Sequence, residues 1–98
     1  MYEIRTTDEF SVWLRRLKDA NAKARVNLRI RRIELNGNFG DVKPMGECVS
    51  ELRIDYGPGY RVYFAKRDKL VVLLLVGGDK STQQRDIEKA KRLNAEYE

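Results

Sequence analysis

Histidine is absent from this chain of 98 residues, and cysteine occurs once, at Cys48. The first absence removes the side chain that most often acts as a general acid or base near pH 7 and that most often binds metal ions. A single cysteine cannot form an intrachain disulfide, and nothing in the sequence has the spacing of a zinc site. We therefore expect a protein without a metal ion or any other cofactor.

Long apolar segments are also missing. The longest uninterrupted apolar run covers residues 70–76, far fewer than the ~20 residues that cross a bilayer as a helix. Residues 1–5 do not have the apolar character of a signal peptide. We expect a cytoplasmic protein that has no membrane partner.

Charged residues, in contrast, are abundant. Lysine and arginine number 20 against 15 acidic residues, which gives a net charge of +5 at pH 7. Such a balance attracts polyanions such as nucleic acids over a long range, although many small proteins are basic without binding them. The length predicts one domain, residues 1–98, with a modest core.

The first part of the chain predicts a short strand and two helices. Residues 2–5 alternate as in a strand, and Thr6 with Glu9 forms a capping box that opens a helix. Apolar residues then recur at helical spacing, first at Phe10, Trp13, Leu14 and Leu17 and later at Ala22, Val26, Ile30 and Ile33. Gly37 is typical of a helix end, and residues 37–44 have a loop composition. We expect the helices to form an antiparallel hairpin that packs on a sheet, with Trp13 in the core.

The rest of the chain predicts three strands and a helix. Residues 49–54 and 60–65 alternate with period two on either side of a turn at 55–59, and residues 70–76 read as a buried strand that Gly77 and Gly78 end. Ser81 with Gln84 forms a second capping box, which opens the last helix. The fold class is therefore α+β. In the order β-α-α-β-β-β-α, a helical hairpin and a C-terminal helix pack on a small, largely antiparallel sheet.

Five segments, in this order and spacing, resemble the RelE/ParE superfamily of bacterial type II toxins. More closely, the chain is similar to the branch of addiction-module killer proteins that is related to the HigB toxins and to a phage protein family. The matching segments run nearly from end to end: Phe10-x-x-Trp-Leu, Gly37-Asn-Phe-Gly-Asp41, Glu51-Leu-Arg-Ile54, Gly57-Pro-Gly-Tyr-Arg-Val-Tyr-Phe64 and Leu73-Leu-Leu-x-Gly-Gly-Asp-Lys-Ser-Thr-Gln83.

This resemblance implies a toxin that is neutralised by a small antitoxin, often a helix-turn-helix protein. Relatives of the RelE kind cut messenger RNA in the ribosome, whereas relatives of the ParE kind poison DNA gyrase, so the fold alone does not decide the activity. We expect a ribosome-dependent, metal-independent endoribonuclease that inhibits translation, with messenger RNA and the ribosome as partners. A toxin directed at gyrase and a decayed toxin that acts as an antitoxin-binding co-repressor are the alternatives.

RNA cleavage without a metal ion or histidine is most simply achieved by attack of the ribose 2′-OH on the adjacent phosphate, which leaves a 2′,3′-cyclic phosphate and a 5′-OH. Such a site needs cations near the phosphate, a base and an acid. Arg61 is the first candidate for the phosphate clamp, because a guanidinium group binds phosphate oxygens in a bidentate manner. The alternative for Arg61 is a cross-strand salt bridge with Glu51.

Arg53 and Glu51 are two residues apart in a strand and therefore share a face. By resemblance, these two positions often carry basic catalytic residues, and the glutamate is a departure from that pattern. Glu51 could act as a general base if its pKa is raised, or it could remain an ionised structural partner of Arg53 or Arg61; the structural role is favoured.

Two lysines complete the predicted catalytic region. Lys80 precedes a helix N-terminus, where free backbone N–H groups favour anions, and it lies where relatives place a catalytic arginine or lysine. The alternative is a solvated loop lysine. Lys43, in the predicted loop at residues 37–44, is a further candidate for contact with the phosphate that Arg61 is expected to bind.

More distant residues are candidates for RNA binding. Arg25, Arg29 and Arg32 recur at helical spacing and could hold ribosomal RNA phosphates, or they could form a solvated helix face. Tyr63 and Tyr56 are candidate stacking surfaces for bases, with packing on the sheet as the alternative for Tyr63. The C-terminal aromatic or histidine of many RelE-type nucleases is not evident, because Tyr97 is predicted to pack in the last helix.

Overall fold

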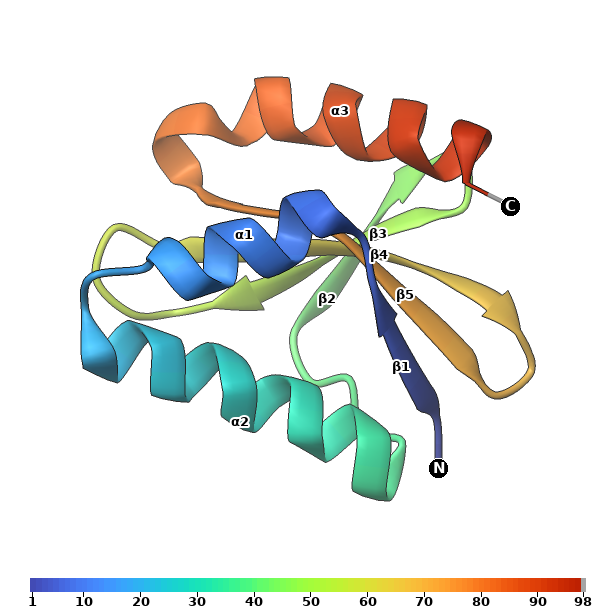
Figure 1. The fold of residues 1–98 in the computed structure, drawn as a ribbon, viewed down its shortest axis with the longest axis horizontal. Helices are drawn as coiled ribbons and strands as arrows, with labels where there is room; N and C mark the ends of the chain where they lie inside the picture. Colours follow the sequence, from blue (N-terminus) through green and yellow to red (C-terminus); the bar gives the residue numbers. More distant parts are fainter. Residues whose placement is uncertain (98) are drawn as a thin grey trace.

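The structure, a computed structural model, describes residues 1–97 (Figure 1). Its elements follow one another as β1 (Glu3–Thr6), α1 (Asp8–Arg16), α2 (Ala20–Asn36), β2 (Val42–Gly46), β3 (Val49–Ile54), β4 (Tyr60–Asp68), β5 (Val71–Asp79), a 3-10 turn (Lys80–Thr82) and α3 (Gln83–Glu96). Within residues 1–97, no helix is both long enough and apolar enough to cross a membrane.

The strands form one mixed sheet in the order β1-β5-β4-β3-β2, in which only the pair β1 and β5 is parallel. This arrangement confirms the predicted α+β class and its largely antiparallel sheet. The prediction of a loop over residues 37–44 was wrong for β2. Gly37, Gly40 and Pro44 suggested a loop, but proline is tolerated in β2 because this strand lies at the edge of the sheet.

Helices cover both faces of the sheet, with α2 on one side and α3 on the other (Figure 1). The α2 face, which α1 also covers, carries a core of fully or nearly fully buried residues: Phe10, Val26, Ile33, Leu52, Ile54, Val62, Phe64, Val72 and Leu74. The α3 face carries a second core: Val49, Tyr63, Ala65, Leu73, Leu75, Val76 and Ala90. Trp13 packs against the first core, as predicted. Because both faces are covered, β4 and β5 are buried along most of their length.

The start of α1 differs by one residue from the prediction. Thr7, not Thr6, caps the helix, since its Oγ1 accepts a hydrogen bond from the Phe10 N–H at 3.0 Å. The same hydroxyl donates to the Leu75 carbonyl at 2.7 Å. Thr7 thereby joins the helix start to β5, a tertiary contact that the local capping pattern did not reveal.

The entry into α3 also differs. Gly77 and Gly78 lie inside β5, which ends only at Asp79, and Ser81 does not cap the helix. Asp79 instead accepts hydrogen bonds from the N–H and hydroxyl groups of Ser81 and so stabilises the 3-10 turn. The N-cap of α3 is Thr82, and the helix therefore begins at Gln83, one residue later than the predicted capping box implied.

Candidate functional site

The predicted catalytic residues of the hairpin β3–β4 lie on the α3 face of the sheet. Arg53 on β3 stands directly opposite Arg61 on β4. Two residues along the same strands, and on the same face, Glu51 stands opposite Tyr63. The period-two prediction that Glu51, Arg53 and Arg61 share a face is therefore confirmed. We use the name arginine cluster for a set of five residues: Glu51, Arg53, Arg61, Tyr63 and Gln83, the last of which belongs to α3.

Glu51 is the centre of the arginine cluster and is fully buried. Its Oε1 lies 3.4 Å from the Arg53 Nε and 3.8 Å from the Arg61 Nε. Its Oε2 accepts hydrogen bonds from the Tyr63 hydroxyl at 2.8 Å and from the Gln83 Nε2 at 2.7 Å. This geometry favours the structural alternative, in which Glu51 is the shared counter-ion of both arginines.

The two arginines differ in accessibility. The side chain of Arg53 is 38% exposed, whereas that of Arg61 is 7% exposed and lies deeper. One terminal nitrogen of Arg61 donates to the Tyr60 carbonyl at 3.0 Å, while its buried Nε has no hydrogen-bond partner among residues 1–97. Arg53 thus presents positive charge at the surface, whereas Arg61 beside it is almost entirely buried.

Lysines lie on two sides of the cluster. Lys43 on β2 is exposed and stands directly opposite Glu51 in the sheet. The exposed Lys80 follows the last residue of β5, and its N–H donates to the Gly59 carbonyl at 3.1 Å. Its side chain packs on Gly59, where a Cβ would lie 3.0 Å from the Lys80 Cε and where φ is +82°. Glycine at 59 therefore lets the turn approach Lys80 closely.

The arginines of α2 do not act as one stripe. Arg29 donates to the carbonyl groups of Arg53 at 2.5 Å and of Phe39 at 3.0 Å, and burial lowers the pKa of its guanidinium. Arg25 lies over the Tyr56 ring at 4.5 Å from its centroid, and Arg32 is exposed. Arg29 thus connects α2 to the sheet, and of the three predicted arginines Arg25 and Arg32 remain candidates for RNA binding.

The two tyrosines proposed as stacking surfaces have different environments. Tyr63 is fully buried, and burial together with its hydrogen bond to Glu51 raises the pKa of its phenol. The structure therefore contradicts the stacking role for Tyr63 and supports packing on the sheet. Tyr56 is half-buried, and its hydroxyl donates to Asp19 at 3.1 Å.

Gln83 was missed by the sequence reasoning, and so was the role of Tyr63 as a donor to Glu51. The register of the hairpin, which places Tyr63 opposite Glu51, contained a signal for the second. No local pattern pointed to Gln83, because its contact with Glu51 spans 32 residues. Within residues 1–97, no group of three or more side chains is arranged to bind a metal ion.

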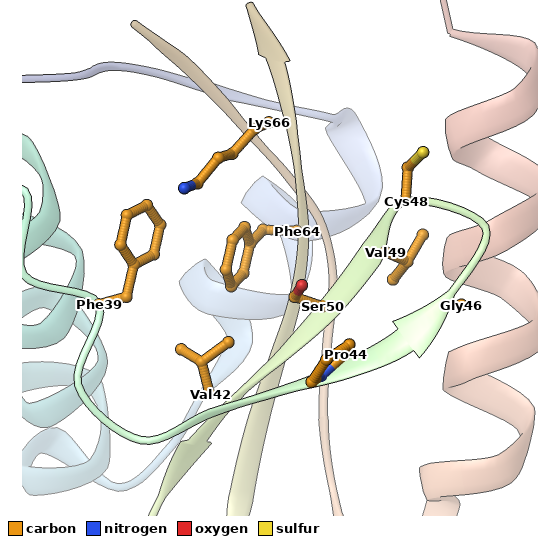
Figure 2. A pocket seen from close by; sticks show the side chains of 9 residues that line it. All are labelled: Phe39, Val42, Pro44, Gly46, Cys48, Val49, Ser50, Phe64 and Lys66. Atoms are coloured by element: carbon orange, nitrogen blue, oxygen red, sulfur yellow. The ribbon is translucent and has the colours of Figure 1, made fainter. Parts of the chain in front are cut away.

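A second region, an apolar hollow of about 620 Å³, lies near the β2 edge of the sheet (Figure 2). Figure 2 shows Phe39, Val42 and Phe64 gathered at one end of the hollow, with Lys66 reaching toward Phe39. The rings of Phe39 and Phe64 stack with centroids 5.3 Å apart, and the Lys66 Nζ lies 4.6 Å from the Phe39 centroid. The hollow is thus an open apolar surface with one cation at its wall.

The arrangement of helices and strands is that of the RelE toxin. A chain of the intact E. coli RelBE toxin–antitoxin complex is similar with a TM-score of 0.68 at 16% identity, over 81% of this chain and 96% of that one. A double arginine-to-alanine mutant of E. coli RelE in the free state is similar with a TM-score of 0.69 at 17% identity, over 94% and 97% of the two chains.

Sequence comparison places the chain more narrowly. Residues 12–96 match the family described as "Phage derived protein Gp49-like (DUF891)", and the chain belongs to this family. An uncharacterized protein of Haemophilus influenzae is 51% identical over 94 residues, which cover 96% of this chain and 94% of that protein.

Proposed function

We propose that this protein is the toxin of a toxin–antitoxin pair and that it cuts messenger RNA on the ribosome. The observation that carries the proposal is the register of β3 and β4, which places Arg53 directly opposite Arg61 on one face of a RelE-like sheet. Two guanidinium groups side by side, with Lys43 and Lys80 nearby, suit a phosphate of the RNA backbone.

The chemistry that this site supports is attack of a ribose 2′-OH on the neighbouring phosphate. Negative charge grows on the phosphate oxygens as the new bond forms, and cations fixed near those oxygens stabilise the transition state. In this proposal Arg53, which is the more exposed, binds the incoming phosphate, and the more deeply placed Arg61 stabilises the phosphorane. As the bond between the 2′ oxygen and phosphorus forms, the bond between phosphorus and the 5′ oxygen breaks. The proton lost from the 2′-OH is balanced by one that the 5′ oxygen gains, so the products are a 2′,3′-cyclic phosphate and a 5′-OH.

In this proposal Glu51 positions the two arginines and does not act as the general base. Its Oε2 already accepts two hydrogen bonds, and its Oε1 faces the two arginine Nε atoms, so neither oxygen is directed toward solvent to take a proton from a substrate. The carboxylate offsets the repulsion between two guanidinium groups that stand opposite each other.

The proposed protein partner is an antitoxin, in analogy to the toxin–antitoxin complex of RelBE. The resemblance described above makes a helix-turn-helix protein the expected kind. An acidic segment of such a partner would be attracted to this chain, whose net charge is +5. Coverage of the arginine cluster would exclude RNA.

The test is to map RNA ends by primer extension after induction of the protein without its antitoxin. Wild type is expected to produce new 5′ ends within translated messages and to stop growth, and Arg61→Ala is expected to do neither while its circular dichroism stays native. Arg92→Ala, a change of an exposed arginine on α3, is the matched control and is expected to behave as wild type.

Three outcomes would contradict the proposal. Growth arrest that persists in folded Arg61→Ala removes the role of Arg61. DNA-damage signalling with intact messenger RNA points to gyrase as the target. Harmless expression without an antitoxin points to a decayed toxin that only binds its partner.

A further inference from the structure

Gln83, the first residue of α3, reaches back to the sheet. Its Nε2 donates to the Glu51 Oε2 at 2.7 Å, and this is a contact between the C-terminal helix and the middle of β3. The following residue, Gln84, is exposed and donates to Glu88 within the helix at 3.2 Å. Two adjacent glutamines thus face different surroundings, and only Gln83 touches the arginine cluster.

A fully buried carboxylate needs hydrogen-bond donors to compensate for its lost hydration. Tyr63 and Gln83 both donate to the same oxygen of Glu51, from the sheet and from the helix. Two donors from different directions fix the rotation of the carboxylate about its χ3 angle. The other oxygen, Oε1, is then held facing the Nε atoms of Arg53 and Arg61.

Both arginines depend on that oxygen for their charge partner. Among the ion pairs of residues 1–97, Glu51 is the only acidic partner of Arg53 and of Arg61. Like charges that stand directly opposite in a sheet repel each other, so the place of the carboxylate decides where the two guanidinium groups rest.

We propose that Gln83 is a positioning residue, which acts through Glu51 to hold Arg53 and Arg61 in the geometry that binds the scissile phosphate. The effect on cleavage rests on the proposed function; the effect on the arginines does not. Gln83 directly follows the 3-10 turn that begins with Lys80, so the same helix start that carries Lys80 also anchors the arginine pair.

The experiment compares Gln83→Leu with Gln84→Leu. Leucine keeps most of the volume but cannot donate, so Gln83→Leu removes one of the two donors to Oε2. In single-turnover cleavage of messenger RNA on programmed ribosomes, Gln83→Leu is expected to cut about tenfold to a hundredfold more slowly at saturating ribosome concentration, because small misplacements of catalytic groups have effects of that size. Its affinity for ribosomes is expected to change less than about twofold. Gln84→Leu is expected to match wild type in both.

A second readout needs no activity. The Arg61 Nε–H is buried and has no hydrogen-bond partner within residues 1–97, so its NMR resonance reports the carboxylate beside it. This resonance is expected to shift in Gln83→Leu and to stay unchanged in Gln84→Leu. Should Gln83→Leu fail to fold, Tyr63→Phe removes the other donor to the same oxygen without loss of the ring and is expected to shift the same resonance.

The outcomes separate the two proposals. Equal cleavage rates for the two glutamine variants of a wild type that does cut messenger RNA, or an Arg61 resonance that does not move in Gln83→Leu, would overturn the positioning role. If the wild-type protein leaves messenger RNA intact but the Arg61 resonance still shifts in Gln83→Leu, the proposed function is wrong. The link between Gln83 and the arginines is then still supported.

Discussion

The arginine cluster and the apolar hollow lie on opposite faces of one sheet, and β3 contributes to both. Ser50 faces the hollow and its neighbour Glu51 faces the cluster. On the α3 face, helix and strands are in close contact and the buried carboxylate is bonded from several sides. On the other face, about 620 Å³ beside Phe39 and Phe64 is open.

The difference teaches how one small sheet can combine fixed and adaptable surfaces. Charged groups are held in place before any ligand arrives, because a buried charge without fixed partners would destabilise the fold. Apolar side chains need no such partners, so the hollow can stay open without a comparable cost per group. Changes of charge or volume should therefore be severe on the α3 face and mild in the hollow.

The largest expected effect is that of Glu51→Gln. The amide keeps the shape but would turn an NH2 group toward the Arg53 and Arg61 Nε–H groups, and both arginines would lose their counter-ion. Removing one partner of a buried ion pair costs about 3–5 kcal/mol. Urea unfolding measures the loss. Glu3→Gln is the control, since the pair of Glu3 with Arg5 is shorter, at 2.7 Å, but exposed, and little change is expected. Equal losses in the two variants would contradict the importance of burial.

A smaller loss is expected from Gly78→Ala, which adds one methyl group to the α3 face. Gly78 stands opposite Arg61 in the sheet, and a Cβ there would lie 2.0 Å from the Asp86 Oδ2. Asp86 is itself buried and bonded to Thr82, so the first turn of α3 must shift. Such overpacking costs about 1–3 kcal/mol. Thermal unfolding measures it, and an unchanged midpoint would show that α3 can retreat freely from the sheet.

The phenol of Tyr63 provides a pH-dependent test of the same face. Its pKa is raised, so the neutral form is favoured in the folded protein. The resulting contribution to the free energy of unfolding is fully present below the pKa of unfolded tyrosine, about 10. As pH rises above 10, the unfolded state ionises first, and about 1 kcal/mol of stability is lost by pH 10.5.

The measurement is the difference in urea stability between wild type and Tyr63→Phe from pH 7 to 10.5. The advantage of wild type should be constant up to about pH 9.5 and then shrink. Tyr2→Phe controls for loss of a hydroxyl elsewhere on the chain. An advantage of wild type that stays constant across pH 10 would contradict the linkage.

The sequence predicted the arginine pair well and its supports poorly, for physical reasons. Alternation in a hairpin with a short turn determines which residues share a face, so Glu51, Arg53 and Arg61 could be placed together. The same alternation places Tyr63 on that face. The sequence around Tyr63 does not show, however, that α3 covers this face and buries the ring. Gln83 depends on where the helix begins, which Asp79 decides through the 3-10 turn. β2 was hidden by Pro44, which only an edge strand accommodates.

The smallest effect, of opposite sign, is expected from Ser50→Val at the hollow. Ser50 is half-buried on β3, stands opposite Phe64 and lines the open volume, so the added methyl groups have space and apolar neighbours. Valine also suits a strand better than serine does, and a gain of about 0.5–1 kcal/mol is expected in urea unfolding. Ser50→Ala separates loss of the hydroxyl from filling of the space, because it does only the first. If valine instead destabilised as much as Gly78→Ala, the two faces would be equally tight, and the contrast between a fixed charged face and an adaptable apolar one would not hold.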